Sequence, residues 1–331
     1  MKSSSITRRF ALVSGLVLSA LGTATVAHAQ ADNWPSKPIR MVVPSAPGAG
    51  GDIFARLIAN PLGAILKQPV VVDGKPGANG MIAADMVAKA PGDGYTLLFA
   101  PSSAILINPV MQPKMPYDTE KDLIPIAQVG AAGILLVANP KTGFKNLADM
   151  VAYAKANPGK LAYSSWGTGS SGHLAMEGIK AHYGLDMTHV PYKSIPQEVA
   201  DLIGNNISVG FTDIASPLPH IREGRLNGLG TTGSARGPAS QEIPTLTEQG
   251  YKFDADGWYA IFAPKGTPQE IVDRLATEIN KIQHTPEVRA QIESQNMVIP
   301  PVRTAAEFAE AIKADAVIWQ GLVKATGLQN K

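Results

Sequence analysis

Cysteine is absent from the 331 residues of this chain. The absence excludes disulfide bonds, a cysteine nucleophile and thiolate metal sites. The six histidines are scattered and show neither H-x-x-x-H nor H-E-x-x-H spacing, so the sequence predicts no metal site and no cofactor. A chain of this length can bury a core large enough for two domains without such cross-links.

An excess of either charge is also lacking. Lysine and arginine number 29, and aspartate and glutamate number 27. Three of the basic residues, Lys2, Arg8 and Arg9, fall in the first 29 residues, which contain no acidic residue. The rest of the chain therefore has 26 basic and 27 acidic residues and a formal charge of −1. Nothing in this balance indicates a nucleic-acid partner.

The first 29 residues have the pattern of a secretory signal peptide. Basic residues precede an uncharged apolar run over 10–26, which ends at the cleavage pattern Ala27-His28-Ala29. A membrane anchor is the alternative, but the run is short for a bilayer span and is diluted by glycine and serine. Twin-arginine and ordinary secretion both stay open. We expect residues 1–29 to be removed on export.

A glycine-rich turn, Pro44–Asp52, joins a strand expected at 39–43 to a helix expected at 53–65. A helix start attracts anions because its first N–H groups have no intrahelical partner and its dipole favours negative charge. The turn lacks the Lys-Ser/Thr of a phosphate-binding loop and the last glycine of G-x-G-x-x-G. Its Asp52 either caps the helix or positions a ligand. The turn supplies the candidate ligand-binding residues Ser45, Ala46, Gly48, Ala49, Gly50 and Asp52.

A second unit of the same kind follows, with a strand at 161–164, a loop at 165–172 and a helix at 173–182. Hydroxyl and backbone N–H groups can hold a carboxylate reversibly without lysine or arginine. Two such loops that face each other would hold an anion from both sides. The candidate residues of this unit are Ser164, Ser165, Thr168, Gly169 and Ser170, and Ser102 is added after a strand expected at 95–100.

Strands and helices alternate along most of the chain, which predicts an α/β fold with parallel sheets. Ligands of such sheets bind outside the carboxyl ends of the strands. The loops at 44–52, 74–80 and 101–103 all follow expected strands, so we expect them to share that edge.

Trp166 is unusual in a loop of small residues. It either packs as a plug between two lobes or forms a flat wall against which an aromatic ligand stacks. Phe54, Trp258 and Tyr259 are further candidates for such a wall, although Phe54 belongs to an expected helix and is also suited to the core.

A secreted serine hydrolase is the enzymatic alternative, because several serines lie close to His173. The G-x-S-x-G pattern of a nucleophile elbow does not occur in the sequence. His173 also falls in the first turn of an expected helix, where local packing is the more common role. We therefore expect no enzyme.

Several motifs, taken together and in order, resemble the Bug (TctC-like) extracytoplasmic solute receptors of tripartite tricarboxylate transporters. They cover essentially the whole chain after the signal peptide. The matching segments are 34–40 (WPSKPIR), 47–52 with 55–56, 76–78 (PGA), 88–98 (AKAPGDGYTLL), 107–109 (INP), 167–174 (GTGSSGHL), 189–193 (HVPYK) and 263–268 (APKGTP).

The resemblance implies a type II periplasmic binding fold with two α/β lobes, crossover strands and a ligand cleft between the lobes. Lobe 1 would comprise 33–130 and 258–331, and lobe 2 would comprise 131–257. Backbone amides, hydroxyls and water would hold the ligand carboxylates, and Asp213, at a strand end, would face the cleft. The implied partners are a small carboxylate and the membrane components of the transporter, and a periplasmic monomer is expected.

Three positions depart from the family pattern. Ser194–Gln197 replaces a segment that is usually rich in glycine, Met81 replaces a residue that is often polar, and Trp166 replaces a residue that is often small. These departures favour a flat aromatic dicarboxylate such as terephthalate. An aliphatic di- or tricarboxylate receptor and a sensor that presents its ligand to a membrane partner remain alternatives.

Overall fold

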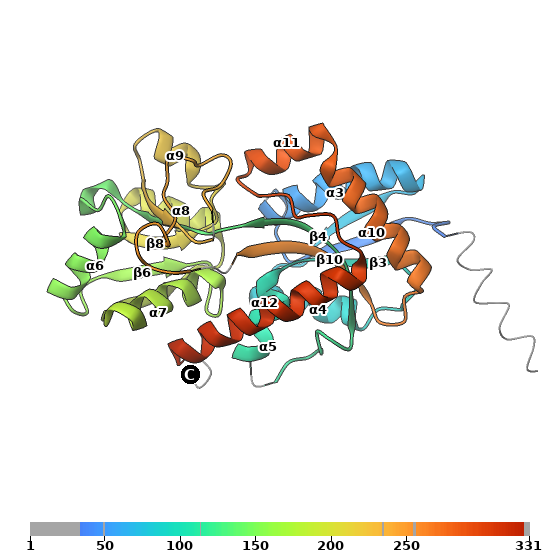
Figure 1. Ribbon diagram of the computed structural model, residues 1–331, viewed down its shortest axis with the longest axis horizontal. Coiled ribbons are helices and arrows are strands. Elements are labelled where there is room, and N and C mark those ends of the chain that lie inside the picture. Colours follow the sequence, from blue (N-terminus) through green and yellow to red (C-terminus); the bar gives the residue numbers. More distant parts are fainter. Residues whose placement is uncertain (1–33, 49, 113, 234, 254–255, 328–331) are drawn as a thin grey trace, which may run out of the picture.

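The computed structural model describes residues 34–48, 50–112, 114–233, 235–253 and 256–327. The expected signal peptide and Ala49 lie outside the described residues. Two five-stranded sheets form two lobes (Figure 1), with strand orders β2-β1-β3-β10-β4 in lobe 1 and β7-β6-β8-β5-β9 in lobe 2. The architecture confirms the expected α/β class with two lobes.

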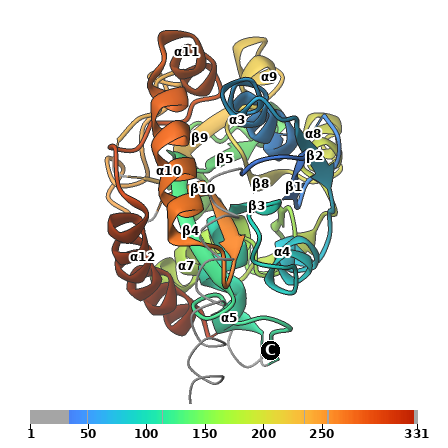
Figure 2. The same ribbon diagram turned by 90° about the vertical axis from the view of Figure 1, so that its right-hand side faces the viewer.

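Three strands of lobe 1 run parallel and are joined by helices: β1 (Ile39–Val43), α3 (Gly50–Leu66), β2 (Val70–Gly74), α4 (Met81–Ala88) and β3 (Thr96–Pro101). Met41 and Val43 face the core shared with α3, and Val42 faces the core shared with α4. Alternate residues of a strand point to opposite faces of the sheet. Figure 2 shows α3 and α4 on opposite sides of these strands, so the loops after β1, β2 and β3 share one edge, as expected.

Lobe 2 repeats this arrangement with β6 (Ala162–Ser165), α7 (Ser171–Tyr183), β7 (Thr188–Pro191), α8 (Ile195–Gly204) and β8 (Val209–Thr212). Ser170 begins α7 as its N-cap, because its side chain accepts a hydrogen bond from the His173 N–H. The loops after β6, β7 and β8 therefore lie at the carboxyl edge of the second sheet.

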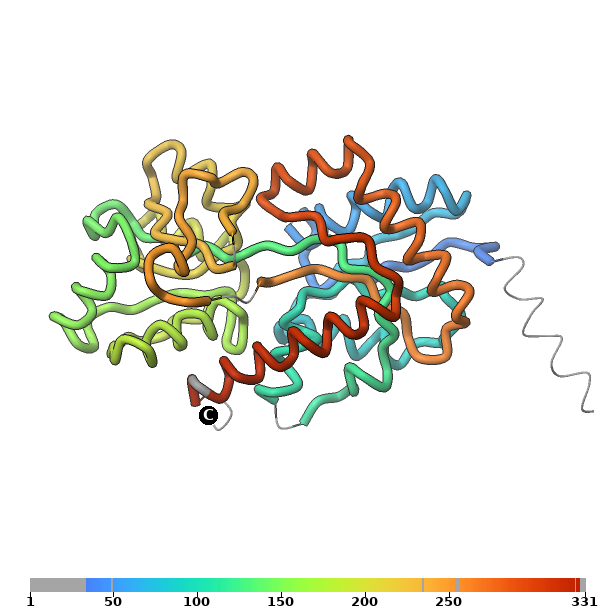
Figure 3. The backbone as a smooth tube through the Cα atoms, in the orientation of Figure 1, coloured from blue at the N-terminus to red at the C-terminus, as the bar shows by residue number. Residues whose placement is uncertain are grey.

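Each sheet also contains one antiparallel strand, which the sequence reasoning did not predict. β4 (Leu123–Ala132) leads from lobe 1 to β5 (Leu135–Ala138), and β10 (Gly257–Pro264) leads back (Figure 3). β5 runs antiparallel to β8 and to β9 (Asn227–Thr231), and β10 runs antiparallel to β3 and β4. The expectation of parallel sheets is wrong for these strands because passage between the lobes, and not a crossover helix, sets their direction.

The C-terminal helix α12 (Ala305–Thr326) packs against both lobes. It begins at a capping box formed by Thr304 and Glu307. Phe308 packs edge-on against Trp258 of β10, and Trp319 packs against Phe253, with ring centroids 6.5 Å apart. Figure 1 shows α12 reaching from the lobe 1 sheet toward α7, with which it is in contact.

The remaining elements are η1 (Ala78–Gly80), a π-helical turn η2 (Ser103–Ile107), α5 (Asn108–Met111), η3 (Pro140–Thr142), α6 (Leu147–Ala156), α9 (Leu218–Arg222), α10 (Gln269–His284) and α11 (Pro286–Ser294). None of the helices in the described part of the chain has the length and apolar character that crossing a bilayer requires.

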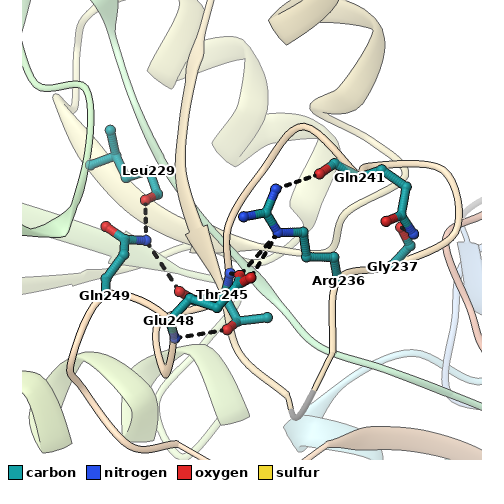
Figure 4. Close-up of polar contacts among 7 residues, drawn as sticks. All are labelled: Leu229, Arg236, Gly237, Gln241, Thr245, Glu248 and Gln249. Carbon is teal, nitrogen blue, oxygen red and sulfur yellow. Dashed lines mark hydrogen bonds and ion pairs between the residues drawn. The ribbon is translucent and has the colours of Figure 1, made fainter.

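Side-chain hydrogen bonds hold the long connection after β9 against lobe 2 (Figure 4). Arg236 Nε donates to both carboxylate oxygens of Glu248, at 3.0 and 3.1 Å, and Arg236 Nη1 donates to the Gln241 carbonyl at 2.8 Å. Gln249 Nε2 donates to the Leu229 carbonyl at 2.9 Å, which ties the connection to β9.

Candidate ligand-binding site

The lobe 1 loop brings the backbone of β1 into the first turn of α3. Gly48 has a φ of 79°, a left-handed conformation that glycine adopts without strain. A Cβ at Gly51 would lie 3.1 Å from the Ser45 Cβ, so the loop packs closely against the helix start. Ser45 and Gly50 are partly buried, whereas Ala46 and Gly48 are exposed. The loop thus presents backbone and small side chains at a helix N-terminus, which favours an anion.

Asp52 holds this loop together. Its carboxylate accepts two hydrogen bonds from Arg56, both at 2.9 Å, and one from the Gly48 N–H at 3.0 Å. The hydrogen bond from Arg56 lowers the pKa of Asp52, against the opposing effect of burial, and the Gly48 N–H adds to the lowering. Asp52 is 4% exposed. Both carboxylate oxygens are therefore used within lobe 1 to fix the loop.

The lobe 2 loop is held by neutral hydroxyl groups. Ser165 Oγ lies 2.8 Å from His189 Nε2, donates to the Gly167 carbonyl at 3.1 Å and accepts from Ser170 Oγ at 3.2 Å. Ser164, Ser165 and Ser170 are fully buried, whereas Thr168 is exposed at the tip of the loop. The hydroxyls of Ser165 and Ser170 thus set the shape of the loop, the Ser164 hydroxyl points to the Val209 carbonyl of β8, and Thr168 is left on the loop surface.

Two stacked histidines lie beneath this loop. The rings of His173 and His189 are 3.9 Å apart and nearly parallel, and the Tyr163 ring lies beside both, 5.0 Å from His189 and 6.4 Å from His173. The Tyr163 hydroxyl donates to Glu177, which is also paired with Lys180. Burial and, to a smaller extent, the charge of His173 lower the pKa of His189 to about 4. His189 is therefore neutral at pH 7.

The two loop edges face each other at Asp213. A Cβ added at Gly50, in lobe 1, would lie 3.6 Å from Asp213 Oδ2, which follows β8 in lobe 2. Asp213 accepts hydrogen bonds from the Ser216 N–H and hydroxyl, both at 3.0 Å. Burial raises the pKa of Asp213, and these hydrogen bonds oppose the rise. Burial and, second, the charge of Asp213 raise the pKa of Tyr259 to about 12. Tyr259 therefore lies in the same region as Asp213.

Of the aromatic candidates, Tyr259 lies closest to this region. Its ring stacks between Phe54 at 5.8 Å and Phe99 at 5.2 Å. Phe54 is 4% exposed and packs in the core of lobe 1. Trp166 is partly buried, and its ring covers Gly172 in the first turn of α7, where a Cβ would approach it to 2.7 Å. The lack of a side chain at Gly172 therefore leaves the space that the Trp166 indole occupies on lobe 2.

Trp258 of β10 and Ser102, which follows β3, are hydrogen-bonded to each other. The Ser102 hydroxyl accepts a hydrogen bond from the Trp258 N–H at 3.3 Å and is 2% exposed. The Trp258 indole donates to Asp315 of α12 at 2.8 Å, so it faces α12 and not the Asp213 region. Neighbouring residues of a strand point to opposite faces, which separates Trp258 from Tyr259.

The structure adds a residue that the sequence reasoning missed. Asn79 Nδ2 donates to the Gly169 carbonyl of lobe 2 at 3.1 Å and to Asn108 Oδ1 at 2.9 Å, and Asn108 Nδ2 donates to the Asn79 carbonyl at 3.0 Å. Residues 77–80 all have positive φ. An asparagine within a glycine-rich turn is the signal that could have identified it, because asparagine tolerates the left-handed conformation.

Ser165 and His189 form the closest serine–histidine pair of the loop, but their surroundings do not suit hydrolysis. Ser165 is fully buried and its hydroxyl is already hydrogen-bonded to Gly167 and Ser170. A low pKa also makes His189 a weak base. The described residues contain no group of three or more acidic or histidine side chains suited to a metal ion.

Two α/β lobes, joined by crossing strands and facing each other through anion-favouring loops, define the class of two-lobe periplasmic solute-binding proteins. The chain belongs to the tripartite tricarboxylate transporter family receptors (TctC), whose sequence profile matches residues 54–328. It is 35% identical to Protein BugT of Bordetella pertussis over 328 residues, which cover 98% of this chain and 99% of BugT.

Solved structures show the same fold. A Rhodopseudomonas palustris protein with adipate is 29% identical with a TM-score of 0.84, and the match covers 89% of this chain and 98% of that protein. The MatC protein of the same organism, with bound malate, is 27% identical with a TM-score of 0.81, over 88% of this chain and all of MatC. The proteins that this chain resembles are thus receptors for solutes and not enzymes.

Proposed function

We propose that this protein captures a small dicarboxylate between its two lobes in the periplasm and delivers it, as a monomer, to the membrane components of a tripartite tricarboxylate transporter. The candidate binding residues are Ser45, Ala46, Gly48, Ala49, Gly50, Asp52, Phe54, Ser102, Ser164, Ser165, Trp166, Thr168, Gly169, Ser170 and Asp213. Asp52, Phe54, Ser102 and the three buried serines act by shaping the loops, and the backbone of both loops meets the ligand.

One observation carries this proposal. The two facing loops contain hydroxyl and backbone donors but neither lysine nor arginine. Neutral donors and a helix N-terminus can hold a carboxylate. A buried charged pair would bind it more tightly and release it more slowly. An arrangement of neutral donors suits a receptor that must release its solute. The adipate and malate bound by the structural relatives are dicarboxylates, which agrees with this chemistry.

We infer that the ligand is aromatic, with terephthalate as the model compound. Trp166 exposes part of its indole beside the lobe 2 loop, and indole stacks well on flat rings. Tyr259 adds a second aromatic ring on the lobe 1 side. A receptor for an aliphatic di- or tricarboxylate is the alternative, and a ligand-presenting sensor would use the same site with a different membrane partner.

Calorimetric titration with terephthalate, adipate and malate in separate experiments tests the ligand class. We expect one ligand per protein and tighter binding of terephthalate, with Trp166→Ala weakening terephthalate more than adipate. Tight binding of the aliphatic acids alone would overturn the aromatic assignment. Binding of none of the three would contradict the dicarboxylate proposal.

A charge placed at the start of α3 tests the position of the site. Gly50→Asp puts a carboxylate beside Asp213, and we expect at least a hundredfold loss of dicarboxylate affinity through like-charge repulsion. Gly321→Asp is the matched control, because nothing lies within 4 Å of a Cβ there. Equal affinity of the two variants would place the ligand elsewhere. Co-purification with the membrane components, with and without ligand, tests delivery.

A further inference from the structure

Behind the lobe 2 loop, Glu198 is a buried carboxyl group with no hydrogen-bonded partner. It belongs to the first turn of α8, is 0% exposed, and neither of its carboxyl oxygens has a hydrogen-bond partner. An ionised carboxylate in such a place loses its hydration without compensation, which is costly. Such an unpartnered acid in a folded protein calls for an explanation.

Glu198 lies directly against the strands that carry the candidate loop. A Cβ at Gly210 of β8 would lie 3.1 Å from Glu198 Oε1 and would clash with Ser164 Oγ. Glycine at 210 therefore makes room for both side chains at one level of the sheet. The Ser164 hydroxyl donates to the Val209 carbonyl at 3.5 Å. It also interacts with the Glu198 carboxyl group and lowers the pKa of Glu198, although the geometry does not amount to a full hydrogen bond. Ser164 thus stands between Glu198 and the loop.

No cation in the described part of lobe 2 compensates Glu198. The ionisable groups around it are Asp213 after β8, Tyr192 in the loop after β7, and Asp201 one turn further along α8. Tyr192 donates to Asp201 at 2.9 Å, so these two groups satisfy each other. Lys193, just before α8, is exposed to solvent. Glu198 therefore faces one further carboxyl group, Asp213, and no positive charge.

We propose that Glu198, as an uncharged carboxylic acid behind Ser164, allows lobe 2 to accept an anion and makes capture of the ligand proton-dependent. Loss of its proton would place a second negative charge beside Asp213 at the edge where the dicarboxylate binds. The step is a simple protonation, in which a carboxylate oxygen takes a proton from solvent and no other bond changes. The inference rests on the proposed function.

The electrostatics support this assignment. Burial raises the pKa of Glu198 to about 8, with the charge of Asp213 adding to the rise and Ser164 opposing it. Below that pH most molecules carry the proton and are competent to bind an anion. Above it the competent fraction falls tenfold per pH unit, and the apparent Kd rises by the same factor.

Titration of the wild-type protein and Glu198→Gln with terephthalate and adipate between pH 6.5 and pH 9 tests the proposal. We expect the wild-type Kd to weaken about tenfold between pH 7 and pH 9. The amide of Glu198→Gln has the same shape and cannot ionise, so its Kd should change less than about twofold. Glu242→Gln, at an exposed position, should keep the wild-type pH profile.

A measurement without ligand separates this inference from the proposed function. The folded protein keeps a proton on Glu198 that the unfolded chain releases, so the wild-type melting temperature should fall relative to that of Glu198→Gln as the pH rises from about 4.5 to about 8. Parallel melting profiles, or a wild-type Kd independent of pH, would overturn the inference and leave the receptor function intact. Absence of binding by every dicarboxylate would contradict the receptor function. The comparison of melting temperatures would still show whether Glu198 keeps its proton in the folded protein.

Discussion

The two loops that face each other between the lobes are built on the same plan but held in different ways. In lobe 1 a charged pair, Asp52 and Arg56, fixes the turn from β1 into α3. In lobe 2 neutral serines fix the turn from β6 into α7, and one of them, Ser165, is hydrogen-bonded to His189 of a stacked histidine pair. Both loops precede a helix N-terminus, so both favour an anion.

This difference gives the two lobes different electrostatic characters. The negative charge of Asp52 is balanced by Arg56 within lobe 1, which leaves the backbone dipoles of α3 to act on a ligand. Lobe 2 holds two carboxyl groups, Glu198 and Asp213, that no cation among the described residues pairs with. We infer that a dicarboxylate meets its stronger anchor on lobe 1, and that lobe 2 closes on it while Glu198 carries its proton.

The largest effect should come from breaking the charged pair of lobe 1. Asp52→Ala leaves the Gly48 N–H and the Arg56 guanidinium without their acceptor, and charge-assisted hydrogen bonds contribute about 1.5–3 kcal/mol each. We expect a loss of about 2–3 kcal/mol in the free energy of unfolding, together with loss of ligand binding. Urea denaturation and calorimetry measure the two effects.

The matched control is Glu310→Ala, which removes an exposed ion pair with Lys313 on α12. Exposed pairs of this kind contribute little to stability, because water and salt screen them. If Asp52→Ala and Glu310→Ala destabilise the protein equally, the charged pair does not hold the lobe 1 loop, and the contrast between the lobes is lost.

Ser165→Ala makes the corresponding change in lobe 2. It removes the hydroxyl that joins His189, Gly167 and Ser170, and a buried polar group left without a partner costs about 1–3 kcal/mol. We expect a loss of about 1–2 kcal/mol, smaller than for Asp52→Ala because no formal charge is left unpaired. Ser294→Ala, at an exposed helix end, serves as the control in the same denaturation experiment. An equal loss in both serine variants would contradict the support role of Ser165.

Acid should weaken lobe 2 before lobe 1. Burial lowers the pKa of His189 from its usual 6.5 to about 4, so the stabilising effect of the neutral ring is complete above pH 6.5 and is lost as the pH falls toward 4. Allowing for solvent screening of a partly buried ring, we expect a loss of about 1–2 kcal/mol over this range. The measurement is thermal unfolding against pH for the wild-type protein and His189→Gln, with the exposed His182→Gln as control. A profile unchanged by His189→Gln would assign the acid sensitivity to other groups.

Much of the fold could be predicted from the sequence because strand and helix patterns are local. The strand expected at 39–43 has the bounds of β1, and the helix expected at 53–65 lies within α3. β10 (Gly257–Pro264) is apolar but was not predicted as a strand. It lies beside β4, which continues into lobe 2 and is not followed by a helix, so β10 does not fit the alternating pattern of strands and helices. The position of β10 depends on the return of the chain from lobe 2. Its antiparallel direction is a property of the whole fold and not of the local sequence.

The candidate site was predictable to the level of its loops but not of its side chains. Glycine-rich turns after strands identified both loops, and the helix cap role open to Asp52 could be seen in the sequence. The sequence does not show that Asp52 turns back onto Arg56, nor that Glu198, in the first turn of a helix where glutamate is ordinarily exposed, is fully buried. Those facts depend on packing between elements far apart in the chain.

The smallest expected effect concerns the hydrogen bond that joins the two loop edges directly. Asn79→Gly keeps the left-handed backbone, which glycine adopts readily, and removes the side chain that donates to Gly169 and Asn108 and accepts from Ser103. We expect about 0.5–1.5 kcal/mol of destabilisation, because water replaces part of these neutral hydrogen bonds at a partly exposed turn. Since one of these bonds crosses between the lobes, the ligand should also dissociate a few times faster, while its association rate stays the same.

Stopped-flow fluorescence with terephthalate measures both rates, and Asn205→Gly is the matched control. Asn205 also has a positive φ of 60°, but it ends α8 within lobe 2, where it accepts a hydrogen bond from the Ser208 hydroxyl and donates its N–H to the Leu202 carbonyl. Asn205→Gly should leave the dissociation rate unchanged. A slower association rate for Asn79→Gly, with unchanged dissociation, would mean that Asn79 shapes the open lobe 1 loop and does not hold the lobes together. That result would place the difference between the lobes in their separate loops alone.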